Sequence, residues 1–478
     1  MERRRTGSGF VLASVVLVPG MLAATAYWLG DARWTSLSAG LCLLFCNWVL
    51  LGPLRLSALS PASVYLNILA VFHLGLVLPI AAGIAVGPIP AWVRSGSLHA
   101  ALLLLVLALG CFAWGATSAA ARGTRVHTDA PKGEWHNGAL FYCGLAAIAA
   151  GGASLLWGIR EMGFGSFMAA THFETYRLAR TYDPRFFVTS LQLTPMGFYL
   201  ALAAAPRERL SALAWAGAAW AGLIFVLGYR GFALTPVAAC LVILTKRGVR
   251  LPRWAWAGGL AAVLIAIPMS RQLRDTKLSE RTMAASDLSL APLEAIQEMG
   301  GSLRPLIHTI DLMENEQYRW GRTYSQAVKQ IVPNLSLRWG GDVYLPVEDL
   351  PPSHWVSRLA APWNYRNFGG LGCSAVAEPY MNFGPWGVAL AFWLLGYGLV
   401  RVDRMDLRRP TQLACLGMVL GPLLWATRNG SGVFVRPAIW GLALTLAARL
   451  VGDSLARARS RRVQRVRVSP RLRPSTNL

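Results

Sequence analysis

The sequence predicts an all-α, polytopic membrane protein with about twelve transmembrane helices and one large folded loop on the outer side of the membrane. Of the 478 residues, 54% are hydrophobic and only 14% are charged, which is far less charge than a soluble protein of this length carries. The apolar residues fall in runs of about 17–25, the length at which a helix crosses a bilayer. Such runs are too long and too uniformly apolar to be barrel strands.

We count twelve apolar runs in the chain, nine before the long loop and three after it. The eighth and ninth are short and also fit tilted or re-entrant segments. The runs lie at about 10–29, 34–52, 62–86, 98–119, 139–158, 186–205, 210–228, 231–245, 254–269, 376–400, 411–427 and 433–451. The predicted layout is residues 1–269 with nine helices and an outer segment at 159–185, an outer loop at 270–375, three helices within 376–451, and a basic tail at 452–478.

The net charge of +23 comes from 46 Lys and Arg residues against 23 Asp and Glu residues. In a soluble protein this excess suggests nucleic acid as a partner, but here the positive-inside rule explains it. If residues 3–5, all arginine, are cytoplasmic and the sides alternate, most short basic segments fall in the cytoplasm. We therefore expect both termini in the cytoplasm, a disordered basic tail from 457 onward near anionic lipid headgroups, and no nucleic-acid partner.

Two outer segments carry most of the polarity. In the first, 159–185, Tyr176, Arg177 and Arg180 share a helix face and His172 lies nearby. This pattern fits an amphipathic turn on lipid headgroups, and it equally fits a site for an anionic substrate, because the arginine fork suits phosphate oxygens.

In the second outer segment, apolar residues recur at helical spacing over 288–313, with a Gly-Gly break that divides two short helices. A third short helix is expected at 321–334. The stretch 338–368 is rich in Trp and Tyr and contains His354. These aromatic residues suit either sugar rings, whose C–H faces are apolar, or the membrane interface.

Four charged residues are predicted at the outer ends of apolar helices. Glu378 opens the run at 376–400, and we expect it at the membrane mouth because an unpartnered carboxylate is costly in hydrocarbon. Arg230, Arg428 and Arg436 fall on the same side by topology. Each arginine alone is explained by a headgroup contact, but the three together with Glu378 predict a shared site.

Ionisable residues are scarce inside the other apolar runs, and we expect the exception, His73, to be buried and hydrogen-bonded. This scarcity argues against an ion-coupled transporter. No metal-ligand spacing such as CxxC or HExxH is present, and all cysteines except Cys373 lie in apolar runs, so no metal, cofactor or disulfide framework is predicted. Arginines that hold a diphosphate and a carboxylate that accepts a proton suit transfer from a lipid-diphosphate donor.

Two motifs resemble those of the Wzy-type oligosaccharide repeat-unit (O-antigen) polymerases. One is GYRG at 228–231, and the other is AEPYMNFG at 377–384 followed by Gly387. Pro379 stands where the family more often has a small residue. The layout of about twelve helices, with one large loop before the last three, is also similar.

The resemblance implies a metal-independent membrane glycosyltransferase without cofactors in the bacterial inner membrane, acting on its periplasmic face. It implies an undecaprenyl-diphosphate-linked oligosaccharide as substrate, a flippase and a chain-length regulator as partners, and an O-antigen, capsular or exopolysaccharide as product. Our role assignment places Arg230, Arg428 and Arg436 on the diphosphate, with Glu378 as base or as orienter of an arginine, and Tyr380 and Asn382 shape the site. Arg177 and Arg180 gate or bind a second substrate, and Tyr176, His172 and His354 are further substrate-binding candidates. His172, His308 and His354 are also weaker base candidates.

Two alternatives stay open. An O-antigen ligase uses the same donor with a different acceptor. A non-enzymatic flippase or exporter of lipid-linked oligosaccharide would show inverted repeats and polar midplane helices, and neither is evident in the sequence.

Overall fold

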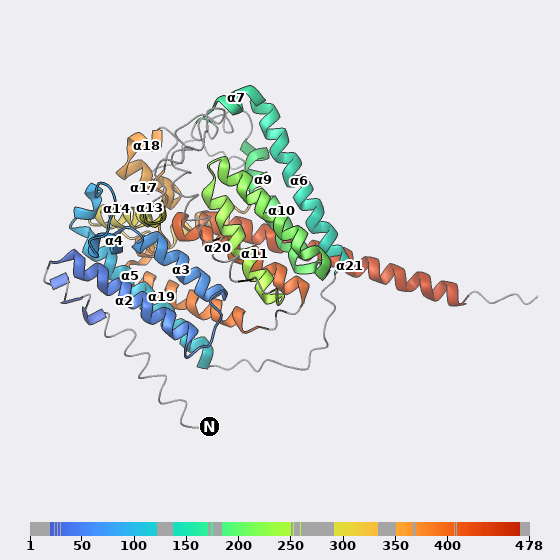
Figure 1. Cartoon of the computed structure of the whole chain (residues 1–478), viewed down its shortest axis with the longest axis horizontal. Coiled ribbons are helices and arrows are strands. Elements are labelled where there is room, and N and C mark those ends of the chain that lie inside the picture. The colour runs from blue at the N-terminus through green and yellow to red at the C-terminus, as the bar shows by residue number, and fades with distance from the viewer. Residues whose placement is uncertain are drawn as a thin grey trace, which may run out of the picture.

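The computed structural model describes residues 20–22, 24–25, 27–28, 30–121, 137–170, 174, 184–249, 252, 259, 291–332, 350–366, 370–405, 407 and 409–468. Within these ranges all regular elements are helices and no strand is present, which confirms the predicted all-α class (Figure 1). The elements are α2 (Ala32–Leu51), α3 (Pro61–Leu74), α4 (Val77–Ala81), η1 (Ala91–Arg94), α5 (Ser97–Ala121), α6 (Gly138–Met162), α7 (Phe164–Ala169), α9 (Pro184–Ala204), α10 (Arg207–Val226), α11 (Arg230–Lys246), α13 (Ala291–Met299), η3 (Gly300–Ser302), α14 (Leu303–Met313), α15 (Arg322–Lys329), α17 (Pro352–Ala360), α18 (Pro362–Arg366), α19 (Ala377–Asp403), α20 (Pro410–Asn429) and α21 (Gly432–Val468).

The predicted apolar runs that fall in the described ranges coincide with helices. The run at 62–86 is divided into α3 and α4. The run at 254–269, apart from residue 259, lies outside the described residues, as does most of the run at 10–29. Among the described residues, six helices are long and apolar enough to cross a membrane: α2, α5, α6, α10, α19 and α21. The chain thus has the character of a membrane protein, and the count of twelve spans stays a prediction.

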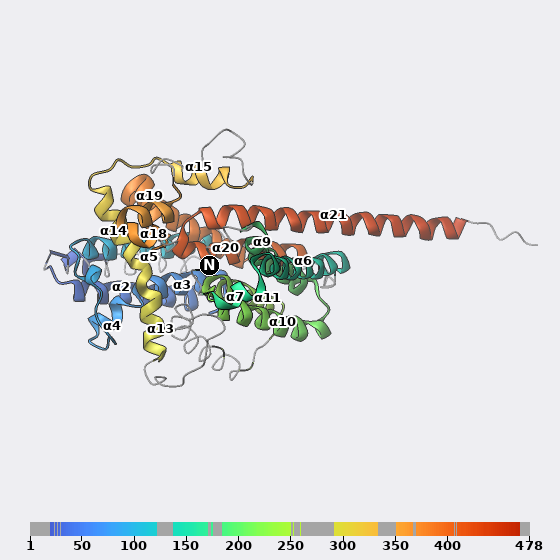
Figure 2. The same cartoon turned by 90° about the horizontal axis from the view of Figure 1, so that it is seen from above.

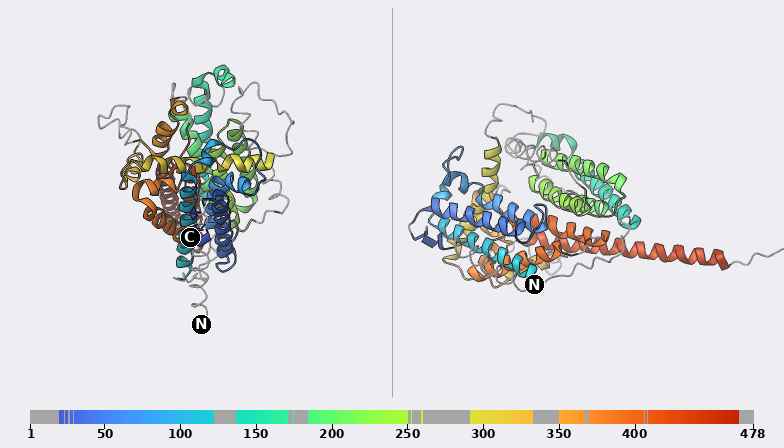
Figure 3. Two further views of the ribbon diagram at one scale, coloured as in Figure 1. Left: turned by 90° about the vertical axis from the view of Figure 1, so that its left-hand side faces the viewer. Right: turned by 60° about the horizontal axis from the view of Figure 1, so that its bottom comes forward.

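The long helices form two groups (Figures 1 and 3). In one group α19 packs along α5, with α2 and α3 beside them, and in the other α6 packs along α9, with α10 and α11 beside them. Helix α20 joins the groups, because it contacts α3 as well as α9, α11 and α21. The two motifs singled out in the sequence, on α11 and α19, are brought together around α20.

Basic side chains cap helix ends at one end of the bundle, which we call the basic end. The Arg247 guanidinium donates to the carbonyls of Leu202 and Ala205 at 2.8 and 2.7 Å, and Lys246 pairs with Asp403 at 2.5 Å. Arg404 donates to the carbonyl of another helix end, that of α5. The alternating topology predicts that these helix ends share one side of the membrane, and cytoplasmic placement of that side stays a proposal.

The short helices predicted at the start of the large loop pack into the opposite end of the bundle. Helix α14 lies along α5, and η3 rests on the break between α3 and α4. The Ser97 hydroxyl donates to the Asp311 carboxylate, and the Val86 N–H donates to Gln297 Oε1 at 3.2 Å. In Figure 2, α13 and α14 run across the bundle, while α15 lies along its edge. The loop segment from α13 to α14 therefore packs against the long helices.

Helix α21 runs well beyond the others (Figures 1 and 2). Its 37 residues correspond to about 55 Å, at a rise of about 1.5 Å per residue. We expected disorder from residue 457 onward, and that expectation is wrong for 457–468, which are helical. The reason is intrinsic propensity, because the stretch contains Ala, Arg and Gln and neither Gly nor Pro.

Candidate functional site

Helix α19 is sharply kinked just inside its start. Phe383 has φ −142° and ψ 17°, and Gly384 has φ 62° and ψ −154°. The Gly384 conformation is open essentially to glycine alone, which explains the glycine of the AEPYMNFG motif. Pro385 follows and has no N–H, so the carbonyl of Met381 loses its partner within the helix.

A loop segment satisfies the backbone groups that the kink releases. Three consecutive amides donate to α19: Arg319 N–H to the Met381 carbonyl at 3.0 Å, Trp320 N–H to the Asn382 carbonyl at 3.1 Å, and Gly321 N–H to Asn382 Oδ1 at 2.9 Å. Asn382 is fully buried, and its amide also donates to Thr323 Oγ1 and to the carbonyl of Glu378. The motif asparagine therefore fixes residues 319–323 to the start of α19.

Glu378 is buried, with only 3% of its surface exposed. Its Oε2 accepts the Ser431 N–H at 2.5 Å, its Oε1 accepts the Ser431 hydroxyl at 2.5 Å, and the Thr323 hydroxyl bonds the same carboxylate. Within the described residues the carboxylate makes no ion pair. Glu378 thus lies at the entrance of α19, and the turn after α20 covers its carboxylate. Its place at the membrane mouth stays a prediction.

The turn that Glu378 holds is the end of α20, where Arg428 lies. The Cys373 N–H donates to the Arg428 carbonyl at 2.7 Å, and the Ala375 N–H donates to the Thr427 carbonyl at 3.1 Å. These bonds cap carbonyls that the last helical turn leaves without a partner. Glu378 and the residues before it therefore fix the position of the Arg428 backbone.

Ser374 links this turn to α3. Its hydroxyl oxygen accepts the Val376 and Ala377 N–H groups at 3.0 and 3.4 Å, which caps the start of α19. The hydroxyl lies 2.7 Å from His73 Nε2, while His73 Nδ1 lies 2.8 Å from the Leu69 carbonyl. A neutral imidazole with its proton on Nδ1 satisfies both contacts. The prediction of a buried, hydrogen-bonded His73 is confirmed.

We expect Ser374→Ala to lower the free energy of unfolding by about 1–3 kcal/mol, because it removes a helix cap and leaves a buried imidazole nitrogen without its donor. Ser374→Thr keeps the hydroxyl and serves as the matched control. The measurement is the unfolding midpoint temperature of the detergent-purified protein. It is obtained from the folded fraction that size-exclusion chromatography shows after heating to a series of temperatures. Equal midpoints for the alanine and threonine variants would contradict the assigned cap.

Two of the three predicted arginines come together. The Arg230 guanidinium, at the start of α11, forms an ion pair with Glu298 of α13 at 2.7 Å. Arg428 interacts electrostatically with both of these groups. Glu298 was missed in the sequence, where it is one acid of an amphipathic loop helix. Arg436 lies on α21, five residues after Ser431.

An apolar groove lies between α9, α11, α20 and α21. It holds about 460 Å³ of free space, including the part open to the surroundings, and Phe232 and Trp425 are among its walls. Trp425 precedes Arg428 by three residues, so both share one face of α20. The arginine pair therefore lies about one helical turn beyond these groove residues.

Each helix that lines the groove contains an internal proline: Pro195, Pro236, Pro422 and Pro437. Proline has no N–H, so the carbonyl four residues earlier loses its helical partner. The residues that carry these carbonyls, Leu191, Phe232, Met418 and Val433, also line the groove. The groove is thus lined by the residues whose carbonyls lose their helical partners, at points where the helices bend most readily.

The last glycine of the GYRG motif packs directly on Trp425. A Cβ at Gly231 would lie 1.0 Å from the Trp425 ring, and the neighbouring Phe232 ring is 4.7 Å from that ring between centroids. We expect Gly231→Ala to lower the free energy of unfolding by about 1–3 kcal/mol through overpacking. Gly222→Ala on α10, where a Cβ meets nothing within 4 Å, is the control. Equal unfolding midpoints for the two variants would contradict this packing.

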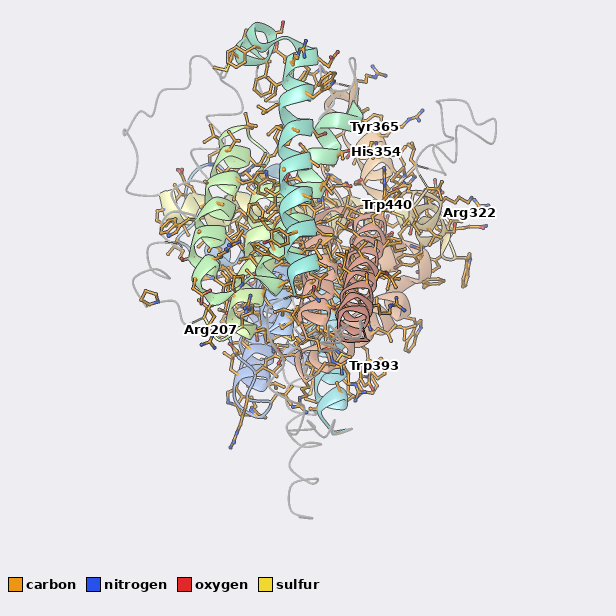
Figure 4. The ribbon with its side chains drawn as sticks, turned by 90° about the vertical axis from the view of Figure 1, so that its right-hand side faces the viewer. Arg207, Arg322, His354, Tyr365, Trp393 and Trp440 are labelled. Atoms are coloured by element: carbon orange, nitrogen blue, oxygen red, sulfur yellow. The ribbon has the colours of Figure 1, made fainter. Side chains whose placement is uncertain are left out.

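The remaining predicted site residues are placed as follows. The Tyr380 ring meets Tyr318 edge-on at 6.4 Å. His354 of α17 meets the Tyr365 ring at 5.8 Å (Figure 4), and the neighbouring Trp355 belongs to the same buried apolar cluster as Met381 of α19. His172, Tyr176, Arg177 and Arg180 lie outside the described residues.

Comparison with known proteins gives one family. A family model described as O-antigen polysaccharide polymerase Wzy matches residues 155–451, from the second half of α6 to the middle of α21. Comparison with curated proteins and with solved structures finds no match. The matched segment contains both motifs, the arginine pair, the loop helices and the groove.

Proposed function

The chain belongs to the Wzy family of O-antigen polysaccharide polymerases, and we propose that it joins oligosaccharide repeat units, carried on undecaprenyl diphosphate, into a polymer. Family membership indicates a polymerising, glycosyltransferase-like activity on lipid-linked oligosaccharide in a membrane. The carrier, the periplasmic face and the bacterial inner membrane are parts of the proposal. So are the cytoplasmic placement of both termini and the partnership with a flippase and a chain-length regulator.

The observation that carries the proposal is the arginine pair beyond the apolar groove. A polyprenyl-diphosphate donor has an apolar chain and a dianionic head, so its recognition needs an apolar surface next to cations. The groove supplies the apolar surface, and Arg230 and Arg428 supply the cations. With Glu298 the three groups carry one net positive charge, which favours an anion. As the glycosidic bond to phosphate breaks, charge grows on the leaving diphosphate, and fixed guanidinium groups stabilise it.

We propose that Glu378 is a positioning residue. Its carboxylate is buried, and both of its oxygens are bonded to Ser431. In this arrangement it fixes the turn after α20 and, through that turn, Arg428. Asn382 has the same kind of role toward residues 319–323. A group that removes the proton of the acceptor hydroxyl must reach the acceptor, and His354, which lies on the outer loop helix α17, is the candidate for that task.

The other arginines complete the proposal. Arg436 lies on α21 near the turn that Glu378 holds, and we propose that it contacts the donor diphosphate. Tyr176, Arg177, Arg180 and His172 are proposed to bind a second lipid-linked unit. Tyr380 is proposed to shape the site through its contact with Tyr318.

Deleting the gene in its source cell tests the function. We expect surface glycan with a single repeat unit, because units still reach the outer face but are not joined. Loss of attachment with polymer still made would instead identify an O-antigen ligase. Accumulation of lipid-linked units on the cytoplasmic side would identify a flippase. Re-expression of the wild-type chain must restore long polymer.

A further inference from the structure

Three aromatic side chains beside Glu378 form a surface that the proposed chemistry does not use. Phe383 lies at the centre: the Trp320 ring meets it edge-on at 6.1 Å, and the Tyr324 ring stacks on it at 6.4 Å with 19° between the planes. Trp320 is 75% exposed and Phe383 is 38% exposed. We call Trp320, Tyr324 and Phe383 the aromatic shelf.

The backbone is shaped to present the shelf. Trp320 has φ 46°, a left-handed conformation that a bulky side chain rarely adopts. The amides of Arg319, Trp320 and Gly321 hold it there through their bonds to α19. Phe383 also lies outside helical geometry, at the kink of α19. Strain of this kind persists where the surrounding structure enforces it, and it is concentrated at ligand sites.

Anchoring at the membrane interface does not require this geometry. Trp386, on the regular part of α19, is 84% exposed without any unusual backbone, as an interfacial tryptophan can be. The shelf differs because three elements build it: the loop segment at 319–321, the first turn of α15, and the kink of α19. This convergence favours a specific ligand over lipid.

The aromatic shelf adjoins the hydrogen-bonded group of Glu378, Thr323 and Asn382. The Thr323 hydroxyl bonds the Glu378 carboxylate and the Asn382 amide, and the next residue, Tyr324, supplies a ring of the shelf. Burial raises the pKa of Tyr324, and the nearby Glu378 carboxylate raises that pKa further. Arg322, exposed at the edge of the molecule in Figure 4, starts the same helix.

We propose that the aromatic shelf binds a sugar ring of the lipid-linked oligosaccharide; this inference rests on the proposed function. A pyranose ring has an apolar C–H face, which packs on an aromatic face, and a polar rim of hydroxyl groups. The exposed rings of Trp320 and Phe383 suit the apolar C–H face, and the guanidinium of Arg322 suits the hydroxyl groups of the rim. Binding sites for small ligands commonly combine apolar walls with a few polar groups in this way.

The test uses the full chain in lipid nanodiscs and the repeat-unit oligosaccharide released by mild acid from its lipid carrier. We expect Trp320→Ala to raise the dissociation constant about tenfold in calorimetric titration, as loss of a single aromatic contact does at many interfaces. The substrate concentration for half-maximal elongation should rise by a similar factor, while kcat stays within about twofold. Trp320→Phe should keep most of the affinity, and Trp386→Ala should bind as the wild type does.

Wild-type binding by both Trp320→Ala and Phe383→Leu would overturn the inference, and so would an equal loss in Trp386→Ala. In either case, continued elongation by the wild type would leave the proposed function standing. A wild-type chain that neither binds the oligosaccharide nor elongates it would overturn both. Size-exclusion profiles matching the wild type establish that each variant is folded.

Discussion

Glu378→Ala is expected to abolish long polymer, with at least about a 100-fold loss of synthesis, whereas Glu378→Gln keeps a measurable fraction. Alanine leaves the Ser431 N–H and hydroxyl without acceptors in a partly buried site and removes a buried side chain, which also lowers the free energy of unfolding by about 2–4 kcal/mol. Glutamine still accepts the Ser431 N–H through its amide oxygen, and its amide donates to the Ser431 hydroxyl oxygen. The turn that carries Arg428 therefore keeps its position.

The comparison of these two variants separates positioning from proton transfer. A general base cannot be replaced by an amide, so a base role predicts that Glu378→Gln is as inactive as Glu378→Ala. Ser431→Ala supplies an independent control, because it removes one donor to the carboxylate and should cause a partial loss. The readout is glycan length on gels from cells with equal amounts of each variant. Equal, complete loss in both Glu378 variants would contradict the positioning role.

The second large effect is expected at the arginine pair. Arg428→Ala should lower polymer synthesis at least about 100-fold, the loss typical for removal of one group that stabilises developing charge. Arg428→Lys should recover part of it, because a lysine keeps the charge but loses the planar fork that suits diphosphate. The initial rate of elongation with purified lipid-linked units is the measurement. Arg207→Ala, exposed at the basic end (Figure 4), should leave that rate unchanged.

The role of Arg230 must be tested with a double variant, because Arg230→Ala alone also removes the ion-pair partner of the Glu298 carboxylate. If Arg230 only neutralises Glu298, the double variant Arg230→Ala, Glu298→Ala should regain activity. We expect no recovery, since Arg230 itself is proposed to hold the diphosphate. Near-normal polymer from the double variant would remove Arg230 from the proposed site.

The sequence predicted most of the fold because helix length and hydropathy are local properties of a membrane chain. It also predicted that Arg230 and Arg428 share one end of the bundle, since alternating topology needs only a count of spans. It did not predict the short, split pair α3 and α4, because the apolar run continues across the break at Gly75 and Leu76.

The partners within the site could not be predicted in the same way. Ser431 lies 53 residues from Glu378 in the chain, and the Asn382 partner Thr323 lies 59 residues away, so both contacts depend on tertiary packing. Glu298 comes from a loop helix that sequence analysis assigned to a separate outer region. The burial of Glu378 follows from the turn after α20, whose path no local pattern encodes.

Reconstitution tests the central claim most directly. The purified wild-type chain in proteoliposomes would receive lipid-linked repeat units isolated from cells that lack the gene. We expect a ladder of lipid-linked products that differ by one repeat unit, and no ladder with Arg428→Ala. Lipid-linked units that stay unchanged in the presence of folded wild-type protein would contradict it.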